Sequence, residues 1–196
     1  ALRDGDMERY NGKGVLKAVG IINEELNNEL KDKEFLSQRE FDNYLIKRDG
    51  TPFKTKLGGN TILSLSMAFC RATAKSIGLE LYEYFGMLYW DKEYNEKKLE
   101  MPRPLVLVME GGKHGSWATD IQEYMVSPKP DIFKSFSKSF ESSTEIFHAL
   151  HDILRDKGYS TNVGFEGAFA PREIKSNEEA FGLIMEAIEK AGHKDE

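Results

Sequence analysis

Two glutamates, Glu123 and Glu166, stand in settings that suit proton transfer. Glu123 lies inside the apolar stretch "IQEYMVSP", and Glu166 lies between glycines in "GFEGAF". An apolar environment disfavours the charged form of a carboxylate, which suits a general acid, and neighbouring glycines let a ligand approach closely. Structural ion pairs produce the same pattern, so the alternative that each glutamate only pairs with a lysine or arginine stays open.

A glycine-rich loop comes just before Glu123. The stretch "GGKHGSWATDIQEYM" contains two successive glycines, His114, a tryptophan and the pair Gln122 and Glu123. A histidine on such a loop can close over a ligand. The stretch therefore carries more kinds of chemistry than a plain connecting loop needs.

The other histidines are weaker candidates. His148 and His151 share one face of an expected helix, but no third ligand of suitable spacing lies nearby, which argues against a zinc site. His193 follows the end of another expected helix, where a cation is favoured by the helix dipole. A structural role is the better interpretation for all three.

Composition excludes several classes of protein. The formal charge of −6 arises from 33 acidic and 27 basic residues that are interspersed, so no basic run is long enough to follow a nucleic acid backbone. No stretch reaches the roughly 18 apolar residues of a membrane span, and the first nine residues lack the apolar region of a signal peptide. The single cysteine, Cys70, is expected to be buried, which fits a reducing compartment. We expect a cytoplasmic protein that binds neither nucleic acid nor membrane.

The first half of the chain is expected to be helical. Apolar residues recur at helical spacing over residues 14–30, and Ser37 with Glu40 forms a capping box for a second helix that ends before "RDGTP". Residues 60–70 contain no charged residue, which predicts a central, buried third helix ending near Gly78. A short helical piece, "LELYEYFG", should close at Gly86.

The second half is expected to mix strands and helices. The charged segment after Met87 and the "MPRP" sequence predict a domain boundary near residue 100. "LVLVME" reads as a strand buried on both faces, and "IQEYMVSP" as a second strand with alternating faces. A helix over residues 133–157 should bury a stripe that includes Phe136 and Phe140, and a last helix should begin with a capping box formed by Ser176 and Glu179. The elements together predict an α/β protein.

The order of the motifs resembles one known family. "DGTPFKTKLGGNTILSLSMAFCRA", "EGGKHGSWATDIQEYM", "TNVGFEGAFAP" and "KSNEEAFGLIMEAIEKAGH" are similar, in this order and spacing, to successive segments of enolase, the phosphopyruvate hydratase of glycolysis. The resemblance implies that residues 1–100 correspond to the helical part of the N-terminal capping domain. It also implies that residues 101–196 form the start of the C-terminal TIM-like barrel, with two strands and two helices.

The resemblance also implies an activity and roles for named residues. Enolases interconvert 2-phosphoglycerate and phosphoenolpyruvate with two magnesium ions. Glu166 matches the general acid for the departing hydroxyl, and Glu123 matches a glutamate of the same hydrogen-bond network. Gln122 and His114 match substrate-binding residues, with His114 on a loop that closes over the substrate.

The sequence departs from the enolase pattern at several positions. Glu110 stands where enolases usually have asparagine before the paired glycines, and Lys113 stands where a small residue is usual. Phe165 replaces an aspartate directly before the loop glutamate. The last change, which removes a carboxylate and adds an apolar ring, alters the charge balance around Glu166.

The segments that carry the magnesium ligands and the lysine base of enolases have no counterpart in these residues. The resemblance therefore implies that this chain by itself is inactive and is completed by a companion segment or joins another copy as a homodimer, because a barrel cut after its second strand leaves an open edge. The alternative is a noncatalytic, enolase-derived binding or structural protein, for which Glu110 and Phe165 would be tolerable changes.

Overall fold

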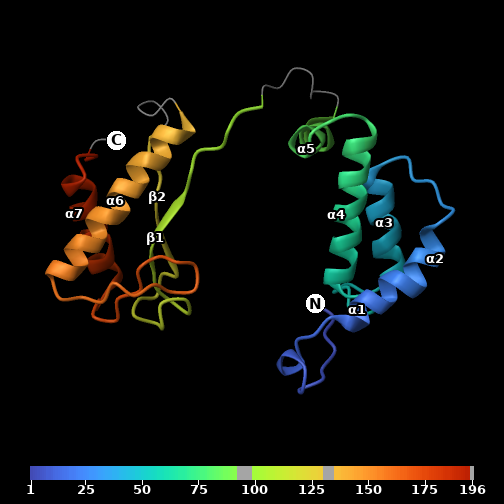
Figure 1. Ribbon diagram of the computed structural model, residues 1–196, viewed down its shortest axis with the longest axis horizontal. Coiled ribbons are helices and arrows are strands. Elements are labelled where there is room, and N and C mark those ends of the chain that lie inside the picture. The colour runs from blue at the N-terminus through green and yellow to red at the C-terminus, as the bar shows by residue number, and fades with distance from the viewer. Residues whose placement is uncertain (92–98, 130–134, 195–196) are drawn as a thin grey trace. The chain divides into compact units, whose positions relative to one another are not determined.

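The computed structural model describes residues 1–91, 99–129 and 135–194 (Figure 1). The chain divides into two compact units, Ala1–Leu99 and Glu100–Glu196. The first unit is helical among its described residues, whereas the second combines a two-stranded sheet with two helices. This is a mixed α/β organisation, as the sequence predicts.

The first helical segment of the first unit is continuous but changes its winding. After the single turn η1 (Tyr10–Gly12), helix α1 (Leu16–Gly20) runs into the π-helical segment η2 (Ile21–Leu26) and then into α2 (Asn27–Leu30). The expected helix over residues 14–30 is confirmed, although apolar periodicity alone gave no sign of the π-helical turns. Leu26 at the end of η2 is completely buried.

Helix α3 (Gln38–Asp49) begins where the sequence predicts and ends two residues later than predicted, because it includes Arg48 and Asp49 of "RDGTP". The Ser37 hydroxyl accepts a hydrogen bond from the N–H of Glu40 at 3.1 Å, and the Glu40 carboxylate accepts one from the N–H of Leu36 at 2.8 Å. Gly50 ends the helix in the left-handed conformation, with φ of 69°, which glycine adopts without steric cost.

Helices α4 (Gly59–Ser76) and α5 (Leu81–Trp90) differ from the expectation in two respects. The apolar stretch of α4 is not fully buried, because Leu63 is 59% exposed and Met67 is 49% exposed. Helix α5 does not close at Gly86 but continues to Trp90, since a capping box starts it at Glu80 and one glycine inside a helix is tolerated. The expected burial of Cys70 is confirmed.

The second unit starts with an antiparallel pair of strands, β1 (Val106–Glu110) and β2 (Glu123–Val126). The pairing places Val106 opposite Val126 and Glu110 opposite Glu123. Side chains of β2 alternate as predicted, with Tyr124 and Val126 buried and Met125 exposed. Only the last three of the five residues of β1 are buried, so the predicted burial on both faces is confirmed for those three residues alone.

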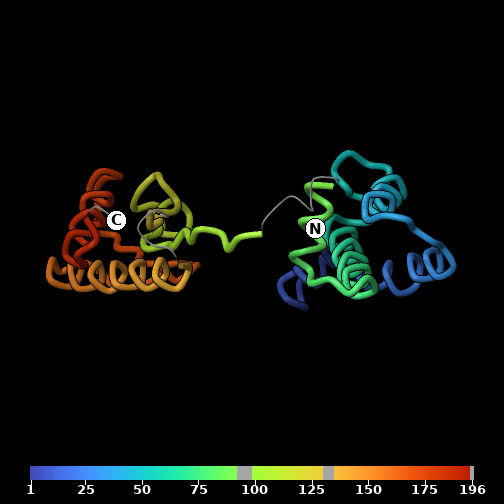
Figure 2. The backbone as a smooth tube through the Cα atoms, turned by 90° about the horizontal axis from the view of Figure 1, so that it is seen from above, coloured from blue at the N-terminus to red at the C-terminus, as the bar shows by residue number. Residues whose placement is uncertain are grey.

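Helices α6 (Phe136–Asp156) and α7 (Asn177–Lys190) pack against each other, and α6 also contacts β1 (Figures 1 and 2). The predicted stripe of α6 is wrong at its start: Phe136 and Phe140 are exposed, because the core of this unit lies against the later turns of the helix. Residue 133, where the helix was expected to begin, lies outside the described residues. The buried core contains Val108, Met109, Tyr124, Val126, Ile146, Leu150, Ile153, Leu154, Phe169, Ile174, Ala180, Leu183, Ile184 and Ala187.

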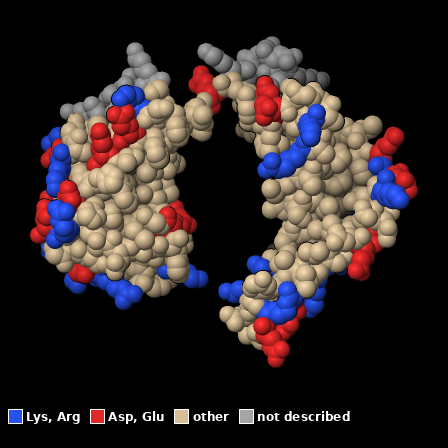
Figure 3. Space-filling view, viewed as in Figure 1, with Lys and Arg blue, Asp and Glu red and all other residues tan. Residues whose placement is uncertain are grey.

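On the face shown in Figure 3, acidic and basic side chains lie next to one another near the edges of each unit, and other residues occupy most of the middle. Among the helices of the described ranges, none combines the length and the apolar character needed to cross a membrane.

Candidate active site

The strand pair positions the first two candidate residues. Glu123 opens β2 opposite Glu110, and its side chain is half-buried. The exposed Gln122 precedes it, and the Gln122 amide donates a hydrogen bond to Glu123 Oε1 at 3.3 Å. These two side chains therefore act as one polar pair at the start of β2.

The loop between the strands is tightly folded and carries His114. A Cβ atom at Gly111 would overlap the Thr119 hydroxyl, so only glycine fits there. Gly112 donates its N–H to the carbonyl of Thr119 at 2.8 Å, and Ser116 and Trp117 adopt left-handed conformations with φ of 57° and 62°. Such conformations are uncommon outside glycine and mark a loop whose shape is dictated by its surroundings.

Three of the predicted site residues converge. Each of the residues His114, Glu123 and Glu166 places one nitrogen or oxygen atom within 4.8 Å of the other two. His114 Nδ1 is 3.6 Å from Glu166 Oε1, and the Phe165 ring meets the His114 ring edge-on with centroids 5.8 Å apart. The structure thus brings together two loops and one strand start that are distant in sequence.

The surroundings of Glu166 differ from the sequence interpretation. Its side chain is 47% exposed, so it does not lie in the apolar environment that its neighbours Phe165 and Phe169 suggested. Phe169 turns into the core at 3% exposed, whereas Phe165 is 78% exposed. The site is therefore open to solvent on the side of the loop that bears Glu166.

Glu110 plays a part in this site that the sequence did not reveal. It is only 2% exposed, and its Oε1 accepts hydrogen bonds from the backbone N–H groups of Glu166, at 3.0 Å, and Ala168, at 2.9 Å. The sequence feature that could have pointed to this role is a carboxylate at the end of a buried strand, because a buried carboxylate needs hydrogen-bond partners. Its partners lie too far along the chain to be read from local sequence.

Asn177, the first residue of α7, is a second residue that sequence reasoning missed. Its Oδ1 accepts hydrogen bonds from the N–H of Asp120 at 3.1 Å, the N–H of Ile121 at 3.3 Å and the hydroxyl of Tyr124 at 3.0 Å. One amide oxygen thus fixes the entry to β2, directly before Gln122 and Glu123.

The start of α7 is itself secured by Glu179. The hydrogen bond from the Tyr159 hydroxyl, at 2.6 Å, lowers the pKa of Glu179, and the N–H of Lys175 lowers it further. The same hydrogen bond raises the pKa of Tyr159. The serine half of the predicted capping box is confirmed, since the Ser176 hydroxyl accepts from the N–H of Glu179 at 3.1 Å. The Glu179 carboxylate accepts from the N–H of Lys175 at 2.7 Å rather than from that of Ser176.

Two other histidines, His151 and His193, each pair with an acidic side chain away from this cluster. His151 Nδ1 lies 3.3 Å from Asp152 on the same helix, and His193 Nε2 lies 2.6 Å from Glu145. Within the described ranges, the group formed by His114, Glu123 and Glu166 is the only one with three metal-ligating side chains in mutual reach.

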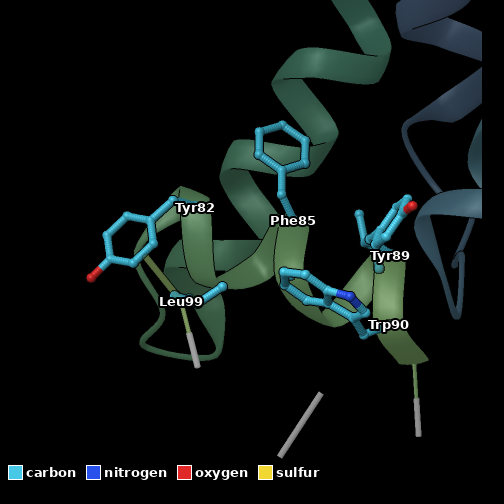
Figure 4. Close-up of a pocket in the computed structure, with 7 residues that line it drawn as sticks. Tyr82, Phe85, Tyr89, Trp90 and Leu99 are labelled. Carbon is cyan, nitrogen blue, oxygen red and sulfur yellow. The ribbon is translucent and has the colours of Figure 1, made fainter. Parts of the chain in front are cut away.

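Two cavities differ in their chemistry. A cavity of about 540 Å³ in the first unit is lined mainly by apolar and aromatic side chains of α5, including Phe85 and Trp90, which offer no acid or base for catalysis near neutral pH (Figure 4). A cavity of about 610 Å³ in the second unit adjoins His114 and is also lined by Lys113 and Arg172. Only the second has ionisable groups at the candidate site.

Known families match the chain over both units. Residues 1–85 match the family described as "Enolase, N-terminal domain", and residues 98–196 match "Enolase, C-terminal TIM barrel domain". The chain belongs to the enolase family. It is 47% identical over 193 residues to the protein named Enolase 1 of Chlorobaculum tepidum, a match that covers 98% of this chain and 43% of that protein. The chain therefore spans less than half the length of this enolase.

The side chains that converge here do not form a suitable magnesium site. Mg²⁺ prefers six oxygen ligands in octahedral geometry. The cluster offers one imidazole nitrogen and two carboxylates, one of which is half exposed. We therefore assign none of these three side chains as a ligand of the magnesium ions that the enolase resemblance implies.

Proposed function

We propose that this chain contributes the acid side of an enolase active site, for the reversible dehydration of 2-phosphoglycerate to phosphoenolpyruvate. The observation that supports the proposal is the convergence of His114, Glu123 and Glu166 within 4.8 Å. Separate elements bring these three groups to one place, and we propose that they serve acid–base chemistry there.

Glu166 is the proposed proton donor. Hydroxide is a poor leaving group, and a carboxylic acid that protonates the 3-hydroxyl as the C–O bond breaks lowers the barrier. Glu166 sits on an exposed loop, where it can reach a substrate, and its backbone is held by Glu110. Glu123, fixed by Gln122 at 3.3 Å, is proposed to complete the hydrogen-bond network around the departing oxygen.

His114 is proposed to bind the substrate by moving with its loop. Its imidazole lies beside Glu166 and is shielded on one edge by Phe165. Closure of this loop would exclude water and strengthen the electrostatic interactions in the site.

The base and the magnesium ions are proposed to be held by segments outside residues 1–196. Mg²⁺ would stabilise the negative charge that develops on the substrate carboxylate. We propose accordingly that the chain acts as part of a larger assembly, with a companion segment or as a homodimer, in cytoplasmic glycolysis.

A chimera tests the proposal. The 193 matched residues of the Chlorobaculum tepidum protein are replaced by the matching residues of this chain, and phosphoenolpyruvate formation is measured with excess magnesium. We expect turnover by the chimera, none by residues 1–196 alone, and a loss of about 10²- to 10⁴-fold in kcat for Glu166→Gln. The matched control is Glu186→Gln, an exposed glutamate on α7 that pairs with Lys157.

Two results would count against the proposal. A folded chimera without turnover would favour the noncatalytic, enolase-derived binding protein. Turnover that is unchanged by Glu166→Gln would remove the proposed acid while leaving the family membership intact.

A further inference from the structure

The buried carboxylate of Glu110 lies at the junction of the three segments that form the site. Glu110 is the last residue of β1, and its Oε1 accepts from the N–H of Glu166 at 3.0 Å and of Ala168 at 2.9 Å. Both donors belong to the loop that carries the proposed acid.

Backbone hydrogen bonds reinforce the same junction. The N–H of Glu110 donates to the carbonyl of Phe169 at 2.8 Å, and the N–H of Phe169 donates to the carbonyl of Val108 at 3.3 Å. The next residue, Gly111, donates to the carbonyl of Gln122 at 2.9 Å. The end of β1 therefore contacts the acid loop on one side and the start of β2 on the other.

The second oxygen of Glu110 is enclosed by the two loops. A Cβ atom at Gly164 would collide with Glu110 Oε2 and would also lie close to the carbonyl oxygen of His114. Oε2 is buried and has no hydrogen-bond partner among the residues that the structure describes. The carboxylate thus fills the space between the segment before Glu166 and the backbone of His114.

We infer that Glu110 is a positioning residue. It holds the loop of Glu166 in the place where the Glu166 carboxylate lies close to His114 and Glu123. Glu110 is not a member of the cluster of His114, Glu123 and Glu166. Its Oε1 is taken up by two backbone N–H groups, and its Oε2 is enclosed beside Gly164. It acts through Glu166. The consequence for catalysis rests on the proposed function, whereas the consequence for the loop does not.

Side-chain length is the property that this role requires. Glutamine has the same length as glutamate and retains one oxygen that can accept both N–H groups. Aspartate keeps the charge but is one methylene shorter, so it cannot reach both donors from the same backbone position. If only the negative charge of Glu110 mattered, Glu110→Asp would be tolerated better than Glu110→Gln.

Amide hydrogen exchange of the chain 1–196, followed by NMR, tests the inference without any assay of activity. In Glu110→Asp and Glu110→Ala we expect the amides of Glu166 and Ala168 to exchange about tenfold faster, as for the loss of one hydrogen bond. In Glu110→Gln their protection should stay near that of the unchanged chain. The amides of Leu150 and Leu154 in α6 serve as the internal control for opening of the whole unit.

The outcomes separate the two roles. The inference is supported if the amides of Glu166 and Ala168 keep their protection in Glu110→Gln and lose it in Glu110→Asp. The length of the side chain would then be what positions the loop. Equal protection in all variants, or better protection in Glu110→Asp than in Glu110→Gln, overturns it. If exchange in Glu110→Asp is accelerated at Leu150 and Leu154 as much as at Glu166 and Ala168, the inference is overturned as well, because the residue would then stabilise the unit as a whole. If Glu110→Ala does not fold, the comparison of Gln with Asp decides.

The chimera tests the consequence of Glu110 for catalysis. Glu110→Asp should lower kcat by about a hundredfold, the effect of a misplaced catalytic group, with a smaller change in KM, and Glu110→Gln should restore it. An inactive chimera would defeat the proposed function while the exchange result on the loop stands. An active chimera that is indifferent to Glu110→Asp would show that the loop position does not limit the reaction.

Discussion

His114 Nδ1 lies 3.6 Å from Glu166 Oε1, although the two residues belong to different loops. Each loop is held by its own contacts: the first by the Thr119 carbonyl and the second by Glu110. The pairing therefore depends on how each loop is held, as well as on the contact between the two side chains.

Replacing His114 should impair the proposed reaction more than replacing another histidine of the same unit. We expect His114→Ala to lower kcat/KM of the chimera by about a hundredfold, since a group that orients the substrate is lost. The control is His148→Ala, an exposed histidine on α6. Steady-state kinetics at saturating magnesium measure both. Equal kinetics for the two variants would contradict a substrate-binding role for His114.

Asn177→Ala should destabilise the second unit. The change removes an acceptor that serves two backbone N–H groups and the Tyr124 hydroxyl, and Tyr124 is only 2% exposed. A buried donor left without a partner costs about 1–3 kcal/mol. The free energy of opening comes from exchange of the slowest amides of α6.

The matched control for Asn177 is Asn162→Ala, because Asn162 is an exposed asparagine of the same unit. We expect a change below about 0.5 kcal/mol for this surface substitution. If both variants open with the same free energy, the three hydrogen bonds to Asn177 contribute nothing measurable.

Local sequence predicted those features whose cause is local. The predicted capping boxes at Ser37 and Ser176 pair residues three positions apart, so their pattern is visible in the sequence. The structure confirms the serine hydrogen bond of each. The helix end at Gly50 has the same kind of cause. In each case the physical requirement is met within one turn of helix.

The features that sequence missed depend on partners far along the chain. Glu110 meets Glu166 at a separation of 56 residues, and Asn177 meets Tyr124 at a separation of 53. Likewise, the apolar run in α4 predicted full burial, but burial needs a neighbour on every side, and Leu63 has none that covers it within the described residues. Motif order identified the candidate site, whereas its supports became visible only in three dimensions.

Stability of the first unit should fall in acid because of Asp49, which is 2% exposed. Burial raises the pKa of Asp49, but hydrogen bonds from the Thr51 hydroxyl and the N–H groups of Leu57 and Thr51 lower it, and the net pKa lies below the ordinary 3.8. A lowered folded-state pKa means that the stabilisation is present above about pH 4 and is lost as the pH falls through the folded value.

Urea unfolding at pH 7 and pH 3, followed by Trp90 fluorescence in a Trp117→Phe background, measures this effect. Asp49→Asn should have a lower midpoint at pH 7, because its amide N–H₂ would face the N–H of Leu57, and it should show a smaller drop between the two pH values. Asp32→Asn, at an exposed position, should keep the pH dependence of the unchanged chain. An unaltered pH dependence in Asp49→Asn would refute the assignment.

The same substitution, glycine to alanine, should have opposite effects at two positions of the second unit. A Cβ at Gly182, on the exposed side of α7, meets nothing within 4 Å, so alanine should stabilise the unit by about 0.5–1 kcal/mol through helix propensity. A Cβ at Gly164 would collide with the enclosed carboxylate of Glu110, so alanine should destabilise it by about 1–3 kcal/mol. Exchange of the slowest α6 amides measures both changes. Because the added methyl group is identical, a stabilising Gly164→Ala would mean that the space between the two loops is not filled by Glu110.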